Sequence, residues 1–282
     1  MKLRKIVLAL LLGTGTLATF AQNPNEDVIG AHLGLKAGVA IQNFQNLKSA
    51  QHILNGTGKT FGLEWGKEMP RSIWNINVGM SNVDLESSLS QYVQVKSTTF
   101  KFDAEYLRQL DSEYFKWYLG VGLNSNFNLF DNSRLQNDQS TYNFLNTLMV
   151  RTAVRKNFKV LGREIKGEFA AGLGLLALSK DTKSFAFTAP QEFLEKGKFN
   201  YQGATGEADN PFRYHQFMGI GKYRRLQTKL NFRINPQSGK RHYWTVGYLW
   251  DYYSYEDVKN YRVTSGTHNI CLSYNFMFHR KK

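Results

Sequence analysis

The chain has 282 residues and a formal net charge of +14, and 14% of its residues are Phe, Trp or Tyr. Glycine contributes 24 residues, whereas cysteine contributes one, Cys271. A single cysteine excludes an intrachain disulfide, and with it a small secreted fold held together by such bonds. No apolar run after residue 21 is long enough for a transmembrane helix. Length and composition therefore favour one large all-β domain.

Residues 1–21 have the pattern of a secretory signal peptide. A basic start carries Lys2, Arg4 and Lys5, and the apolar run 6–12 follows it. The small residue Ala21 then precedes the expected cleavage point, as signal peptidase requires. Cleavage would remove the three basic residues and lower the formal charge from +14 to +11. We expect an exported protein whose mature part is residues 22–282.

The mature part repeats one pattern, in which apolar residues alternate with polar or small ones. This period of two predicts strands with one apolar and one polar face. Ten segments show it, and they span 29–41, 61–66, 74–81, 100–106, 115–127, 148–154, 165–175, 228–234, 244–252 and 267–278. The predicted fold is an all-β, transmembrane, up-and-down antiparallel β-barrel.

The predicted connections also alternate, between short turns and longer polar loops, of which 179–216 is the longest. Short periplasmic turns and longer outer loops are typical of barrels that cross the outer membrane. An even strand number places both termini on the periplasmic side. Twelve strands are the alternative if part of 179–216 forms another hairpin. That loop also contains an apolar segment and a capped helical turn, which fit either a folded outer loop or a lid over the barrel.

Period two does not say which face points outward, and a soluble lipocalin-like barrel would have the same alternation inverted. Two features favour the membrane interpretation. Four tryptophans (Trp65, Trp74, Trp117 and Trp244) fall near the periplasmic ends of their strands, as expected for aromatic rings at a membrane interface. The polar face is rich in glycine, which fits a narrow interior where larger side chains from opposite walls would collide.

Charged residues fall mainly on the polar face of the predicted strands. The expected lumen network comprises Lys101, Asp103, Glu105, Lys116, Arg151, Lys166, Glu168, Arg225 and Asp251. Mirroring the strands about their turns places Arg151 beside Glu168, Arg155 beside Glu164, and Arg225 opposite Asp251. Opposite charges that neutralise one another in a filled interior are one interpretation. A narrow polar pore with weak anion preference is the other.

The sequence offers a few candidate residues for an enzymatic role. Candidate catalytic residues at the outer rim are Asp251, His215 and Asp209, but no pair has a spacing that compels a site. A lipid-facing pair of Ser254 and His268 is a second possibility, although a tight turn would place His268 opposite Trp250 instead. No metal-ligand spacing is present, and we expect neither a cofactor nor a nucleic-acid partner.

Several features resemble known outer-membrane barrels. The closing strand, which ends at Phe278, is similar to the terminal strand of such barrels in Gram-negative bacteria, where the last aromatic residue belongs to the assembly signal. The predicted topology resembles the ten-stranded omptin proteases. The cleavage region (Phe20-Ala21-Gln22) and the LGLKAG sequence at 33–38 are similar to PorT-like barrels of Bacteroidota.

The resemblance implies an outer-membrane location. It also implies contacts with lipid and lipopolysaccharide, and with the barrel-assembly machinery during biogenesis. A small ligand or protein could bind the outer loops. A non-enzymatic barrel, either structural and surface-binding or a narrow pore, is the main functional prediction. The alternative is an outer-membrane hydrolase, omptin-like or lipid-modifying, with a site at the extracellular rim.

Overall fold

A computed structural model describes residues 30–46, 53–87, 94–110, 115–131, 141–181, 216–234, 241–258 and 261–278. The predicted signal peptide 1–21 lies outside these ranges. So do Asp209, His215 and residues 182–215 of the predicted outer loop. Within the described ranges, no helix is long and apolar enough to cross a membrane.

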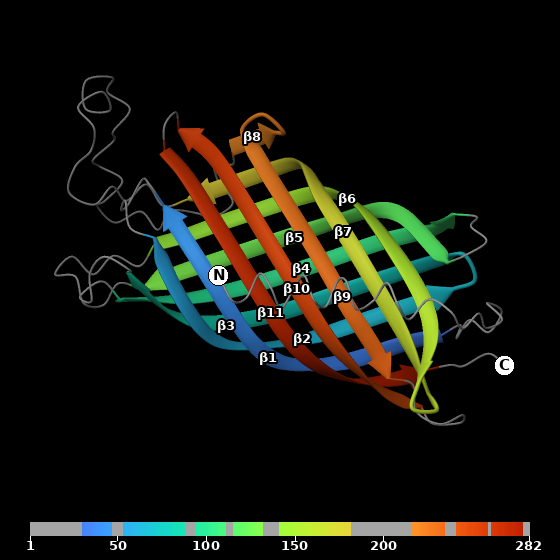
Figure 1. Cartoon of the computed structure of the whole chain (residues 1–282). Helices are drawn as coiled ribbons and strands as arrows, with labels where there is room; N and C mark the ends of the chain where they lie inside the picture. The colour runs from blue at the N-terminus through green and yellow to red at the C-terminus, as the bar shows by residue number, and fades with distance from the viewer. Residues whose placement is uncertain are drawn as a thin grey trace, which may run out of the picture.

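The described residues form one closed antiparallel barrel (Figure 1). Its strands are β1 (Gly30–Asn46), β2 (Leu54–Met69), β3 (Ser72–Ser87), β4 (Gln94–Leu110), β5 (Lys116–Asp131), β6 (Thr141–Val160), β7 (Arg163–Asp181), β8 (Gln216–Gly219), β9 (Tyr223–Ile234), β10 (His242–Val258) and β11 (Tyr261–Phe278). From β1 to β7 and from β9 to β11, each strand pairs with the next along the chain. β9 also pairs with β7, and β11 pairs with β1 to close the ring. The predicted up-and-down barrel is confirmed.

The predicted eighth strand, 228–234, lies within β9, and a short strand that was not predicted, β8, precedes it. Both segments pair with β7, and residues 220–222 interrupt them, so that together they take one place in a ring of ten strands. The twelve-strand alternative is not found in the part of the chain that the structure describes. The predicted loop 179–216 is too long at both ends, because β7 continues to Asp181 and β8 begins at Gln216.

The outer surface of the barrel is apolar, which settles which face points outward. Side chains such as Leu35, Phe61, Val121 and Leu173 are 62%, 51%, 51% and 54% exposed, whereas their chain neighbours on the other face point into the lumen. Towards one end this face becomes polar, as at Asp84 of β3. A broad apolar belt of this kind is the reverse of a soluble barrel. The lipocalin-like alternative is therefore wrong.

Aromatic side chains line both margins of this apolar belt. At the end that holds the short turns, Trp74 packs on Tyr106 and Trp244 on Tyr274, with ring centroids 4.8 and 4.9 Å apart. At the other end, Trp250 stacks on Tyr252 at 6.3 Å. Aromatic rings prefer such positions because each membrane interface is apolar on one side and hydrated on the other.

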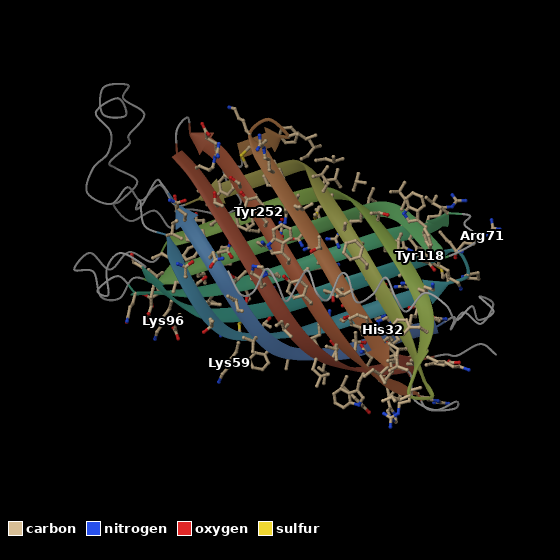
Figure 2. All side chains as sticks on the ribbon, in the orientation of Figure 1. His32, Lys59, Arg71, Lys96, Tyr118 and Tyr252 are labelled. Carbon is tan, nitrogen blue, oxygen red and sulfur yellow. The ribbon has the colours of Figure 1, made fainter. Side chains whose placement is uncertain are left out.

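We call the two ends of the barrel the turn end and the loop end. The turn end contains the β2–β3, β4–β5, β6–β7 and β9–β10 connections together with Gly30 and Phe278. The loop end lies opposite, with Lys96 near it, while Arg71 marks the turn end (Figure 2). The first and last described strands thus begin and end on the same side, as the even strand number requires.

The β6–β7 hairpin is longer than predicted. Its turn is formed by Leu161 and Gly162, both with positive φ (50° and 77°), rather than by residues 156–162. Two consecutive residues in the left-handed region make the tight turn that suits the twist of a hairpin. The longer strands shift the pairing by four residues, so that Arg155 lies opposite Glu168 and Arg151 opposite Gly172. The predicted pairs Arg151–Glu168 and Arg155–Glu164 are wrong.

Glycines on the inward face leave space for long side chains from the neighbouring strands. A Cβ atom at Gly122 would overlap the side chain of Arg151. A Cβ atom at Gly174 would lie 2.8 Å from the ring of Tyr223 and 2.9 Å from Cβ of Arg225. The glycine content of the polar face is thus explained by a crowded interior.

The apolar belt predicts the effect of Leu123→Arg. Leu123 is 44% exposed and lies between Ala104 and Leu148 on the neighbouring strands. An arginine there would face lipid, and we expect a loss of ~2–4 kcal/mol in denaturant titrations of the barrel folded in lipid vesicles. The control is Thr57→Arg, which is also outward and exposed but lies beside Asp84. Equal losses for both variants would contradict a lipid-facing belt.

Candidate functional site: the filled lumen

A cluster of charged side chains around Glu68 lies inside the lumen at the turn end. Its carboxylate contacts Arg155 at 3.2 Å, Lys166 at 2.9 Å and Arg233 at 3.0 Å, and Arg155 also binds Glu168. The guanidinium groups lie over aromatic rings, Arg155 over Tyr118 and Arg233 over Tyr243. Buried apolar residues pack beside this cluster, namely Ile73, Leu107, Tyr118, Ala153 and Ala170. Lys116 lies on the inward face of β5 at this end, opposite Arg155.

A second group of charged side chains lies in the middle of the lumen. Asp103 and Glu105 on β4 both bind Arg151 of β6 and Lys229 of β9, with Lys229 Nζ at 2.8 and 3.1 Å from the two carboxylates. Asn75 and Asn124 donate further hydrogen bonds to these carboxylates, at 2.9 and 3.0 Å. The two carboxylates and the two basic side chains of this group neutralise one another. Arg151 thus extends past β5 to the acids of β4 and does not pair with Glu168.

A third group of charged side chains lies on β1 and β2. Lys36 of β1 binds Glu64 of β2 and donates to Asn77. His32 lies 3.4 Å from the same carboxylate, through Nε2. These side chains are absent from the charge network that the sequence predicted. The contact could have been predicted, because consecutive strands such as β1 and β2 pair in an up-and-down barrel.

The predicted contact between Arg225 and Asp251 is present. Arg225 donates from Nε and Nη2 to the two carboxylate oxygens, at 2.9 and 2.6 Å, and both side chains are buried. The predicted register was wrong by two residues, because Arg225 lies opposite Tyr253 and Asp251 opposite Gln227. The pair forms diagonally on the same face, since a long guanidinium spans that offset. Lys101 lies 4.0 Å from the same carboxylate.

The loop end of the lumen is filled by apolar and aromatic side chains, which sequence analysis missed. This loop-end layer comprises Phe44, Leu54, Val83, Leu85, Val95, Phe130, Leu145, Met218, Tyr223, Tyr253, Tyr255 and Val263, all of them buried. Phe44 and Phe130 stack with centroids 4.3 Å apart. The tyrosine hydroxyls point to inward polar groups, as in the 3.1 Å bond between Tyr253 and Asn128 and the 2.6 Å bond between Tyr223 and Thr147.

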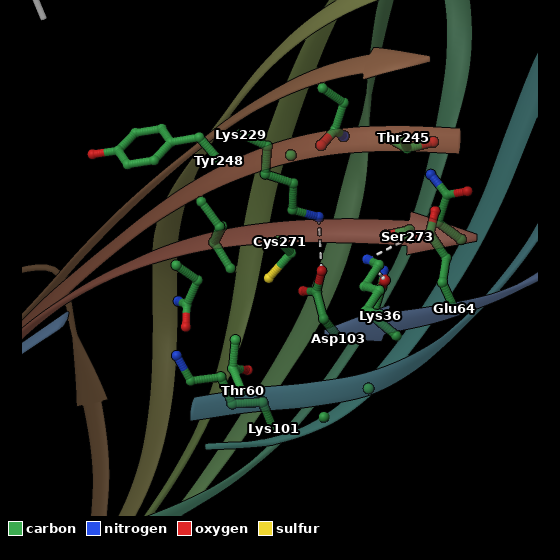
Figure 3. Close-up of a pocket in the computed structure, with 18 of the residues that line it drawn as sticks. Lys36, Thr60, Glu64, Lys101, Asp103, Lys229, Thr245, Tyr248, Cys271 and Ser273 are labelled. Atoms are coloured by element: carbon green, nitrogen blue, oxygen red, sulfur yellow. Dashed lines mark hydrogen bonds and ion pairs between the residues drawn. The ribbon is translucent and has the colours of Figure 1, made fainter. Parts of the chain in front are cut away.

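A cavity of about 170 Å³ lies between these two ends. Its walls carry the charged residues of the middle groups together with Lys101, Asn269 and Cys271 (Figure 3). Gly62, Gly79 and Gly247 also line it and leave the space open. Charged and amide side chains line the cavity, so that it can hold water or a small polar ligand.

The described residues offer little support for the catalytic candidates. Asp251 is fully engaged by Arg225, and His215 and Asp209 lie outside the described residues. His268 faces outward opposite Trp250, as predicted, and hydrogen-bonds Tyr248, whereas Ser254 contacts Thr264 at 3.3 Å. No dyad of Ser254 and His268 forms. Among the described residues, no group of three or more His, Cys, Asp or Glu side chains could hold a metal ion.

No family model matches the chain, and no curated protein matches it. Solved structures with a similar fold include the translocator domain of the autotransporter NalP from Neisseria meningitidis, with 9% identity, 98% coverage of both chains and a TM-score of 0.43. The outer membrane protease OmpT from Escherichia coli has 9% identity, covers 92% of this chain and 99% of its own, and has a TM-score of 0.43.

Ail of Yersinia pestis has 11% identity, covers 88% of this chain and 100% of its own, and has a TM-score of 0.34. These proteins are described as a translocator, a protease and an attachment invasion protein. At such low identities and TM-scores, none of these likenesses assigns a biochemical task to this chain.

The Arg225–Asp251 pair predicts that loss of the acid and loss of the base have unequal effects on stability. Asp251→Ala leaves both Arg225 and Lys101 without their carboxylate, and we expect a loss of ~3–5 kcal/mol in the free energy of unfolding. Arg225→Met should cost less, because Lys101 can still neutralise Asp251. Glu256→Gln is the control at the exposed Arg262–Glu256 pair, where a loss of ~0–1 kcal/mol is expected. Denaturant titration in vesicles measures all three, and a larger loss for Arg225→Met would contradict the shared carboxylate.

Proposed function

We propose that this protein is an integral outer-membrane barrel. The apolar belt and its two aromatic margins support a position within a lipid bilayer. The predicted signal peptide and the terminal Phe278 support export and insertion by the barrel-assembly machinery. A PorT-like identity is part of this proposal and rests on the short sequence similarities at residues 20–22 and 33–38.

We further propose that the barrel is non-enzymatic and closed, with a structural or surface-binding role. The observation that supports this most directly is the loop-end layer, in which stacked Phe44 and Phe130 fill the lumen. The Glu68 cluster closes the turn end in a chemically different way. A continuous water path is needed for ion conduction, and an apolar constriction opposes it by excluding water.

Binding would then fall to the outer surface and the connections at the loop end. The basic excess of the chain supports contact with the acidic head groups of lipopolysaccharide. Exposed basic residues such as Lys59, Lys96 and Arg224 lie above the belt on the outward face. A small ligand or protein partner at the outer loops remains part of the proposal, and residues 182–215 are the longest segment available for it.

The alternative of a rim hydrolase has no specific observation in its favour. Asp251 contributes both carboxylate oxygens to Arg225, and a carboxylate held this way is a poor general base. The remaining candidates are His215 and Asp209. Protease and lipase assays on the purified barrel test this alternative, and activity that is lost in His215→Ala would overturn the non-enzymatic proposal.

Conductance separates a closed barrel from a pore. We expect the wild-type protein to give no steady current in planar bilayers, because both ends of the lumen are filled. The variant Phe44→Ala/Phe130→Ala opens the loop-end layer but leaves the Glu68 cluster in place, so that it should also stay closed. Heat-modifiable migration on gels provides the control that each sample is folded. Steady ion current from the folded wild type would contradict the proposal.

A further inference from the structure

The charges inside the lumen do not balance. Apart from Lys116 at the turn end, the described inward side chains include eight cations, Lys36, Lys101, Arg151, Arg155, Lys166, Arg225, Lys229 and Arg233. They include six carboxylates, Glu64, Glu68, Asp103, Glu105, Glu168 and Asp251. The excess is two positive charges. A buried charge without a counter-charge is costly, so the interior needs compensation.

The two excess charges have different surroundings. One belongs to the turn-end cluster, where three cations meet Glu68 and Glu168 and two guanidinium groups lie over aromatic rings. The other belongs to Lys101 and Arg225, which share the single carboxylate of Asp251. Arg225 takes both oxygens of that carboxylate, whereas Lys101 is 4.0 Å away. Lys101 therefore carries the uncompensated charge in the middle of the barrel.

The ammonium group of Lys101 has no hydrogen-bond partner among the described residues, although it is buried. The same holds for the amide nitrogen of Asn269, a residue that is only 5% exposed. Both residues line the cavity. Lys101 reaches across from β4 to the β10–β11 wall, where Asn269 lies two residues from Thr267, the register partner of Asp251. Two unpaired donors thus face one enclosed space.

We propose that this cavity holds a small monovalent anion, of the size of a halide, between Lys101 and Asn269. The Lys101 ammonium and the Asn269 amide nitrogen both donate, so these two nitrogens cannot satisfy each other. An anion would accept from both and would also remove the excess charge on the Asp251 side. The cavity volume admits a halide together with water. Because the proposal of a closed lumen implies that such an ion enters when the barrel folds, the ion would behave as a built-in part of the structure.

The test is refolding of the purified mature barrel in bromide, followed by crystallography in bromide with anomalous scattering. We expect a bromide peak between Lys101 and Asn269. Lys101→Met should remove the peak, since Arg225 and Asp251 then balance without an ion. Lys59→Met is the matched control, because Lys59 is outward and exposed, and it should keep the peak. Water alone at the site in the wild type, or a bromide peak that persists in Lys101→Met, would overturn the proposal.

A second variant keeps the test decisive if Lys101→Met does not fold. Asn269→Asp places a carboxylate where the anion is proposed, so that it should fold, lose the bromide peak and lose any dependence of heat-modifiable unfolding on halide. In the wild type, we expect the unfolding midpoint to be a few degrees higher after refolding in bromide than in gluconate at equal ionic strength. An unchanged bromide peak in Asn269→Asp would contradict the site.

Retention distinguishes this proposal from that of the closed lumen. After dialysis into bromide-free buffer, a closed barrel should keep about one bromide per chain, because the ion compensates one buried charge. A bromide peak in the crystal combined with loss of bromide on dialysis would uphold the anion site and overturn the closed lumen. Absence of the peak in a barrel that does not conduct would overturn the anion site and uphold the closed lumen.

Discussion

Closure of the sheet is the constraint on which the rest of this structure depends. β1 and β11 pair along their whole lengths, from Ala31 with Phe278 to Asn46 with Val263, so that the described ring has no open edge. A strand surrounded by lipid has no water to satisfy its backbone, and only a closed ring pairs every strand on both sides. Once the ring is closed at this size, all polar side chains that cannot face lipid must fit inside it.

Inside the ring, the polar side chains form charge pairs between neighbouring strands, such as Arg225 with Asp251, and between strands that do not pair. Arg151 extends from β6 past β5 to the acids of β4, and Arg155 and Lys166 reach Glu68 of β2. The path of Arg151 over β5 requires an empty position, which Gly122 provides. The long basic side chains, the acids that they bind and the glycines that make room for them therefore depend on one another. Loss of either charged partner leaves a buried charge.

Alternation in the sequence was sufficient to predict the strands and to divide their residues between two faces, because a period of two is a local property. The positions of the tryptophans and glycines were needed to predict which face points outward. Register was harder. The β6–β7 pairing was missed by four residues because Leu161 adopts a left-handed conformation that nothing in its identity indicates. The Arg225–Asp251 contact survived a two-residue error because a guanidinium can reach a diagonal neighbour. Partners such as Arg151 and Asp103 lie on strands that do not pair with each other, so no turn geometry could link them.

At the loop-end layer, the alternation of outward apolar and inward polar side chains no longer holds. Phe44, Phe130 and Val263 lie near the loop-side ends of β1, β5 and β11, on the face that is polar farther along each strand. At those ends the outward face becomes polar and the inward face becomes apolar, so the pattern inverts within one strand. Inversion follows if the strands extend beyond the lipid, where the outside meets water and the inside can form an ordinary hydrophobic core. The described barrel thus has an apolar outer surface over most of its length and, at its loop end, a polar outer surface around a small apolar core.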